Sequence, residues 1–119
     1  MVSLDRGSPE TGSLHRLAEL RSLAYHQAVA LRLHTEPALL ACARERVEQW
    51  LREGGRSAEY ARRWREILER PIVEIVNVMV ADTETSQALR QATPFAGVLG
   101  ARERWELWRR VRDDFGSGS

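Results

Sequence analysis

The stretch that decides the fold is Thr93–Trp108, Thr-Pro-Phe-Ala-Gly-Val-Leu-Gly-Ala-Arg-Glu-Arg-Trp-Glu-Leu-Trp. Its first half is an apolar turn without a charged residue, and its second half leads into a helix that carries two tryptophans. A turn that faces solvent is usually polar, so the side chains of Phe95, Val98 and Leu99 need cover. We expect this turn either to enter the core or to press against another molecule.

On both sides of the turn, apolar residues recur every three or four positions, which predicts amphipathic helices. The helices are predicted at about 14–34, 37–53, from 57 to about 68, 71–81, from Asp82 or Thr83 to about 92, and 101–114. Gly54-Gly55 supplies a left-handed stop after the second helix, and Thr93-Pro94 ends the fifth. Because the connections are short, neighbouring helices should be antiparallel. The sequence therefore predicts an all-α fold, a compact bundle of about six short antiparallel helices.

Residues 71–81, Pro-Ile-Val-Glu-Ile-Val-Asn-Val-Met-Val-Ala, fit a strand or a helix. The β-branched residues favour a strand. Against that, Glu74 and Asn77 leave a narrow polar stripe at helical spacing, so we predict a helix buried nearly all round. A bundle of this size has little room to bury such a helix, and part of it could complete a dimer.

Length and composition bound the fold. The 119 residues are enough for one domain with its own core, expected at residues 13–115. Residues 1–12, rich in Gly, Ser, Pro and Thr, are predicted to be a flexible N-terminal segment, and Gly116-Ser-Gly-Ser119 is typical of an added linker. No apolar run is long enough to span a bilayer, and a single cysteine fits a reducing compartment. We expect a cytoplasmic location and no membrane contact.

The charged residues are nearly balanced, with 18 basic against 17 acidic, and every basic residue is an arginine. Nucleic-acid binding needs an unpaired basic stripe, and none stands out, so direct DNA binding is doubtful. The sequence also lacks a glycine-rich phosphate loop and a paired carboxylate in an apolar setting. We predict no cofactor.

Metal and thiol chemistry find little support. His15, His26 and His34 fall on the first predicted helix, and the closest two are about 12 Å apart along its axis, too far to share a metal ion. We predict no metal site. Cys42 lies between Ala41 and Ala43 and has no nearby histidine, so it is predicted to be a small core residue.

Arg21 and His26 offer a catalytic alternative. An arginine with a histidine five positions on resembles the arginine-x4–6-histidine motif of the HEPN ribonucleases, small all-helical dimers. The resemblance implies that His26 handles the proton of an RNA 2′-hydroxyl while Arg21 steadies phosphate charge. The other interpretation is that Arg21 is a surface cation and His26 is hydrogen-bonded to a neighbour at the edge of the core.

Four tryptophans are many for this length. Trp50 and Trp64 fall on apolar stripes and are predicted to pack between the second and third helices. Trp105 and Trp108 instead lie among arginines, and Trp and Arg are the residue types that anchor protein interfaces. These two tryptophans fit either a core or an interface.

A family resemblance favours the interface. It covers about 13–112 and rests on Arg21-Ser-Leu-Ala-Tyr-His-Gln-Ala-Val-Ala, on Pro37-Ala-Leu-Leu with Ala43-Arg-Glu-Arg-Val-Glu-Gln-Trp-Leu, and above all on the segment from Ala88 to Trp105. This order resembles the helical toxin-binding region of bacterial antitoxin-like regulators, which commonly follows a helix-turn-helix of the Xre type. Here only about a dozen polar residues precede it, so we expect toxin binding without the DNA-binding domain.

The sequence thus predicts a non-catalytic protein-binding module, an antitoxin of a bacterial toxin–antitoxin system that covers its cognate toxin. Its predicted anchors are Phe95, Trp105 and Trp108, and its predicted charged contacts are Arg90, Arg102 and Arg109. The alternatives are a HEPN-like ribonuclease that uses Arg21 and His26, and a homo-oligomeric helical protein, with a homodimer as the simplest form.

Overall fold

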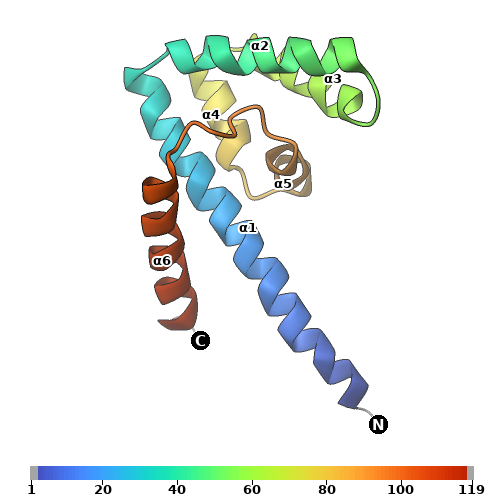
Figure 1. The fold of residues 1–119 in the computed structure, drawn as a ribbon, viewed down its shortest axis with the longest axis vertical. Helices are drawn as coiled ribbons and strands as arrows, with labels where there is room; N and C mark the ends of the chain where they lie inside the picture. Colours follow the sequence, from blue (N-terminus) through green and yellow to red (C-terminus); the bar gives the residue numbers. More distant parts are fainter. Residues whose placement is uncertain (1–2, 118–119) are drawn as a thin grey trace.

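The computed structural model of this chain describes the backbone of residues 3–117 and the side chains of residues 15–115. Six helices follow one another without a strand within residues 3–117, which confirms the predicted all-α bundle. They are α1 (Ser3–Thr35), α2 (Ala38–Glu53), α3 (Ser57–Leu68), α4 (Ile72–Val80), α5 (Glu84–Gln91) and α6 (Ala101–Ser117), shown in Figure 1. No helix in this part of the chain is long and apolar enough to cross a bilayer.

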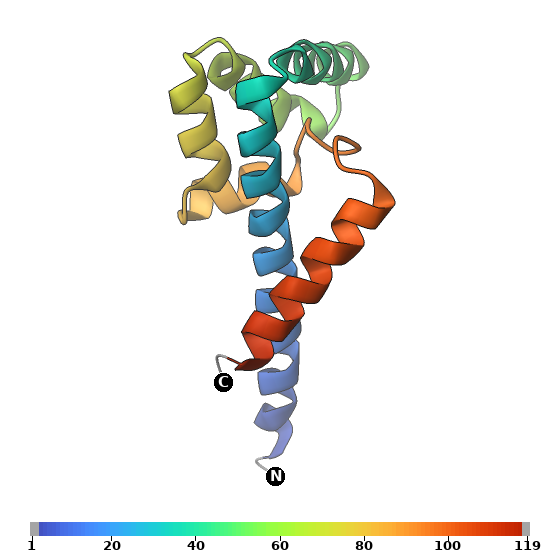
Figure 2. The same cartoon turned by 90° about the vertical axis from the view of Figure 1, so that its left-hand side faces the viewer.

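Helix α1 is the axis of the molecule. Its 33 residues span about 50 Å at 1.5 Å per residue, and the molecule measures 50 × 32 × 24 Å. The helices α2 to α5 gather about its C-terminal half, while α6 runs back along it, and α4 and the first turns of α6 lie on opposite sides of α1 (Figures 1 and 2). Accordingly, among the residues of α1 whose side chains the structure describes, the buried ones lie in its second half; they are Tyr25, His26, Val29, Ala30 and Leu33.

Helix α1 begins earlier than the sequence indicated. The structure starts it at Ser3, whereas the sequence predicts a start at about residue 14, directly after Ser13, a residue type that commonly caps helices. An N-cap contributes only about 1 kcal/mol, so it fixes a helix start only where nothing upstream continues the helix. Of the segment 1–12 that we expect to be flexible, residues 1–2 lie outside the described residues, as do 118–119 of the expected linker.

Helices α2 and α3 form an antiparallel hairpin. The stop between them is the predicted one, because Gly54 and Gly55 adopt φ values of 73° and 81°, which L-residues with a side chain rarely adopt. The hairpin is tied by Arg65, whose guanidinium donates to both carboxylate oxygens of Glu48 at 2.9 and 3.0 Å. Arg44 donates to the carbonyl of Leu68 at 2.9 Å and so caps the end of α3.

Residues 72–80 are helical, as predicted, but α4 is not buried all round. Ile75 and Met79 are buried against the neighbouring helices, whereas Val73 is 63% exposed. The reason is that α1, α3 and α5 contact α4 from one side only, leaving the Val73 side open. Of the two candidate caps of the next helix, Thr83 is the one used, since its hydroxyl accepts from the backbone N–H of Ser86 at 3.0 Å.

The apolar segment 93–100, here called the Phe95 turn, enters the core. Phe95 is fully buried and packs edge-to-face on Trp64, with ring centroids 5.8 Å apart. The Tyr25 hydroxyl donates to the Phe95 carbonyl at 2.6 Å and accepts from the backbone N–H of Val98 at 3.2 Å. Of the two expected environments for this turn, the core is therefore the one observed, and Tyr25 satisfies its buried backbone.

Replacing Tyr25 by Phe should destabilise the fold, whereas the same change at Tyr60 should not. The change removes only a hydroxyl, but the Phe95 carbonyl loses its 2.6 Å bond and keeps only the longer 3.3 Å bond from the backbone N–H of Val98. The buried backbone N–H of Leu99 also loses its contact with the hydroxyl, and together these losses should cost about 1–3 kcal/mol of unfolding free energy. Urea unfolding followed by circular dichroism measures this loss. Tyr60→Phe on the half-buried face of α3 is the matched control and should stay within about 0.5 kcal/mol. Equal losses in both variants would contradict the role assigned to Tyr25.

Candidate protein-binding surface

One face of α6 carries an exposed tryptophan among arginines. Trp105 is 58% exposed, which is unusual for the largest apolar side chain. Arg102 and Arg109 are exposed within one turn of it, and Trp108 is partly buried. Positions three and four apart share a helix face, so these side chains form one continuous patch. We call Arg102, Trp105, Trp108 and Arg109 the Trp105 surface.

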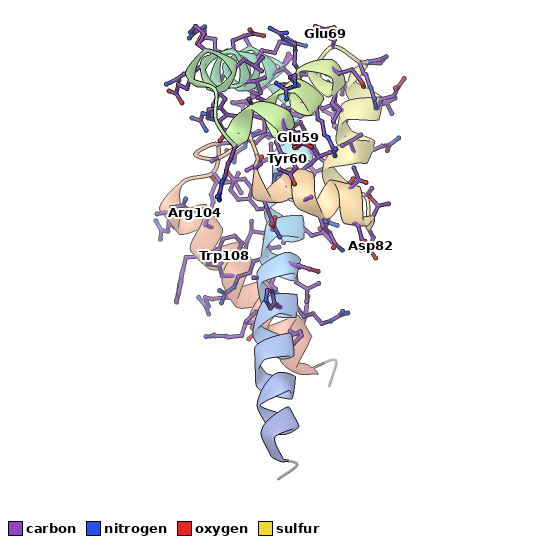
Figure 3. The ribbon with its side chains drawn as sticks, turned by 90° about the vertical axis from the view of Figure 1, so that its right-hand side faces the viewer. Glu59, Tyr60, Glu69, Asp82, Arg104 and Trp108 are labelled. Atoms are coloured by element: carbon purple, nitrogen blue, oxygen red, sulfur yellow. The ribbon has the colours of Figure 1, made fainter. Side chains whose placement is uncertain are left out.

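The two tryptophans of this surface have different environments. Trp108 packs against the edge of the core, and the guanidinium of Arg21 on α1 lies 5.9 Å from the centroid of its ring. Figure 3 shows Trp108 where α6 passes α1. Trp105 lies on the outer side and, with Ala101, Arg104 and Trp108, lines a shallow pocket of about 310 Å³. Trp108 thus anchors α6 to the fold, while Trp105 is available to a partner.

Two of the predicted contact residues are wrong. Phe95 is in the core and cannot reach a partner. Arg90 is only 4% exposed, because its guanidinium donates to the carbonyls of Met79 at 3.0 Å and Ala81 at 2.8 Å. It therefore satisfies the C-terminal end of α4, where a cation is favoured by the exposed carbonyls. The sequence could not show this, because the contact depends on how α5 folds back onto α4.

Arg21 and His26 do not form a shared site. Five positions on a helix correspond to about 140° around its axis, so the two side chains leave α1 in different directions. Arg21 lies over Trp108, and its Nε is buried without a hydrogen-bond partner among the described residues. His26 is 2% exposed. An imidazole in that position is shielded from a bound RNA.

Both ring nitrogens of His26 are occupied. Its Nδ1 donates to the carbonyl of Ser22 at 2.8 Å, and its Nε2 accepts from the hydroxyl of Thr93 at 2.9 Å. The Thr93 hydroxyl in turn accepts from the backbone N–H of Phe95 at 3.0 Å. This chain of bonds fits a neutral imidazole, and burial lowers the pKa of His26 to about 4. His26 therefore has the hydrogen-bonded role that was its non-catalytic interpretation, and it helps to hold the Phe95 turn.

Among the other residues considered, Trp64 is buried and Trp50 is partly buried, whereas Cys42 is exposed. Trp64 is buried, and its Nε1 donates to the Leu89 carbonyl at 3.1 Å, while Trp50 is partly buried against the core, in line with their predicted packing. Cys42 is exposed, so its prediction as a core residue is wrong. Helix α2 turns Ala43 and Val47 inward, and Cys42 falls on the other face. Within the described part of the chain, no group of three or more potential ligands could hold a metal ion.

An apolar groove lies between α1 and α6, where the sequence predicts no site. It encloses about 690 Å³ and is lined mainly by apolar side chains. Its α1 side includes Leu20, Ala24 and Leu31, and its α6 side includes Leu107 and Val111. We call it the α1–α6 groove. The apolar stripe on the first helix was visible in the sequence, but a stripe alone does not tell whether the fold covers it.

No protein-family model matches this chain, and no curated protein or solved structure matches it either.

The pKa of His26 predicts a pH dependence of stability. The imidazole has a pKa of about 4 when folded and about 6.5 when exposed, so the unfolded chain binds more protons between these values. The contribution of neutral His26 to the free energy of unfolding should be fully present above about pH 6.5. It should fall by about 3 kcal/mol on acidification to pH 4. Unfolding in urea at several pH values measures this loss.

His26→Gln is the variant for comparison, because an amide can keep both hydrogen bonds and does not titrate in this range. Between pH 6.5 and pH 4 the unfolding free energy of the variant should fall by about 3 kcal/mol less than that of the wild type. Identical pH profiles of the two proteins would show that His26 is not held neutral.

Proposed function

We propose that this chain is a non-catalytic protein-binding module that acts as an antitoxin and neutralises a cognate toxin by covering its active groove. The observation that carries the proposal is the exposed Trp105 in its arginine-flanked setting on α6. The choice of a toxin as partner rests on the resemblance of residues 13–112 to the toxin-binding region of antitoxin-like regulators.

The chemistry of the Trp105 surface fits a protein partner with carboxylates around an apolar pocket. Burying an exposed tryptophan ring removes a large apolar area from water, and such rings dominate the binding energy of many interfaces. Arg102 and Arg109 flank the ring and can make two parallel hydrogen bonds to a carboxylate. The ring would supply affinity, and the arginines would orient the partner and select for acidic groups.

The core residues position this surface. Tyr25 and His26 hold the Phe95 turn, and the turn leads through Gly100 directly into α6. Glu103, in the first turn of α6, accepts from the backbone N–H of Gly100 at 3.2 Å and pairs with Arg32 of α1. Because these contacts fix the start of α6, the Trp105 surface is already ordered before a partner binds. This pre-organisation lowers the entropic cost of binding.

The ribonuclease alternative finds no support in this geometry. A general base must come within hydrogen-bond reach of the proton that it removes, and His26 is buried with both nitrogens occupied. We therefore do not propose it.

Trp105→Ala should abolish neutralisation without unfolding the chain. The ring is exposed, so its loss costs the fold little, whereas loss of an aromatic anchor weakens binding by about 2–4 kcal/mol, or roughly thirtyfold to a thousandfold. The test co-expresses the chain with the protein encoded by the neighbouring gene. The wild type should relieve the growth arrest that this protein causes and bind it in isothermal titration calorimetry, and Trp105→Ala should do neither.

Val73→Ala is the matched control, because Val73 is a comparably exposed apolar residue on α4, away from α6. It should neutralise and bind like the wild type. Two results would overturn the proposal: a neighbouring gene product that neither arrests growth nor binds the chain, or cleavage of RNA by the purified chain that His26→Ala abolishes.

A further inference from the structure

A stripe of apolar residues on α1 lies outside the core. It consists of Leu17, Leu20, Ala24, Ala28 and Leu31. Leu31 is 74% exposed, and the other four are only partly buried. Four of its members, Leu20, Ala24, Ala28 and Leu31, form the floor of the α1–α6 groove, and α6 supplies one wall through Leu107 and Val111. An apolar groove of this length on the longest helix needs a cover that the described side chains of one chain do not provide.

The spacing of the stripe is the same in both directions along the helix. Its members are separated by three, four, four and three residues, with Ala24 at the centre. If a second α1 packs antiparallel on the first with the two Ala24 residues facing, Leu17 meets Leu31 of the second copy. Leu20 then meets Ala28 of the second copy. From this match we propose that the α1–α6 groove binds a second copy of this chain through antiparallel pairing of the two α1 helices.

The stripe has the properties that a two-fold interface requires. In such an interface the same surface serves both partners, so it must be complementary to its own reversed copy. Here a large leucine meets a small alanine on each side of the centre, and the central pair of alanines lets the helix backbones approach closely. None of the five residues is charged, so the pairing places no charge on the axis of the interface.

The position of α1 also favours a second copy over a different partner. None of the described residues of α1 before Tyr25 is fully buried, although the helix continues through them. A helical segment that is packed on one side only gains little stability from the rest of the fold. A second copy supplies an equally long helix in the opposite direction, so each uncovered segment receives a partner. With the two α6 helices beside them, the paired α1 helices would form a four-helix arrangement.

The groove and the Trp105 surface are distinct. Leu107 follows Trp105 by two residues, which is about 200° around the helix axis. Trp105, with Arg102 and Arg109 beside it, thus points away from the groove, and a dimer can present two of these surfaces. The dimer proposal therefore does not rest on the proposed antitoxin function, and either can fail without the other.

The first test is the oligomeric state of the full chain in solution by sedimentation equilibrium. The wild type should be a dimer. Ala24→Arg and Leu31→Glu place unpaired charges in the pairing and should weaken dimerisation by about a hundredfold or more. Val73→Arg introduces a charge at an exposed apolar residue of α4 and should leave the dimer intact. Circular dichroism verifies that each variant is folded. A wild type that stays monomeric at its highest soluble concentration overturns the proposal, as does a dimer that both groove variants retain.

The second test measures the direction and register of the pairing by disulfide cross-linking, with Cys42→Ser removing the native thiol. Ala24→Cys should cross-link to itself under mild oxidation. Leu17→Cys alone should not, because two copies of residue 17 lie about 21 Å apart along the paired helices. A mixture of Leu17→Cys and Leu31→Cys should cross-link. Efficient self-cross-linking of Leu17→Cys would instead show parallel pairing and reject the arrangement.

Discussion

The hydroxyl of Tyr25 is the contact on which the rest of the structure depends. It joins the middle of α1 to a turn about seventy residues later, through the carbonyl of Phe95 and the backbone N–H of Val98. The backbone groups at Phe95 and Leu99 are buried and cannot hydrogen-bond to water, so they must find partners inside the protein. Tyr25 supplies them with one atom, and the His26–Thr93 bond fixes the start of the same turn. The direction in which α6 leaves the core follows from these contacts.

Arginine has a structural role here as well as a surface role. Arg44, Arg46 and Arg90 donate to backbone carbonyls at Leu68, Ala96 and Met79. Such carbonyls at helix ends and turns have no partner within their own helix, and the guanidinium group reaches them with its several donors. The arginines on the outer face of α6 differ, because Arg102 and Arg109 flank an exposed tryptophan. The same residue type therefore closes the fold in one place and is available for binding in another.

Helix α6 separates two proposed interactions. Its outer face carries the Trp105 surface, and its groove face adds Leu107 and Val111 to the apolar stripe of α1. An antitoxin that pairs through α1 would present two toxin-binding surfaces on one rigid body, and bivalent presentation raises the apparent affinity for a paired target. The long α1 would then serve assembly, and the compact part of the molecule would serve to orient α6.

The sequence by itself determined the helical class, the stop at Gly54-Gly55, a cap at Asp82 or Thr83 and a helix over about residues 71–81, because these depend on local geometry and on the spacing of apolar residues. Only the tertiary structure decided which apolar and charged residues are covered. Phe95 and Arg90 looked like contact residues but lie in the core, Cys42 looked like a core residue but is exposed, and Trp105 and Trp108 could not be told apart. The physical reason is that burial depends on contacts between segments far apart in the chain, such as Tyr25 with the Phe95 turn and Arg90 with the end of α4, and periodicity within one helix carries no information about them.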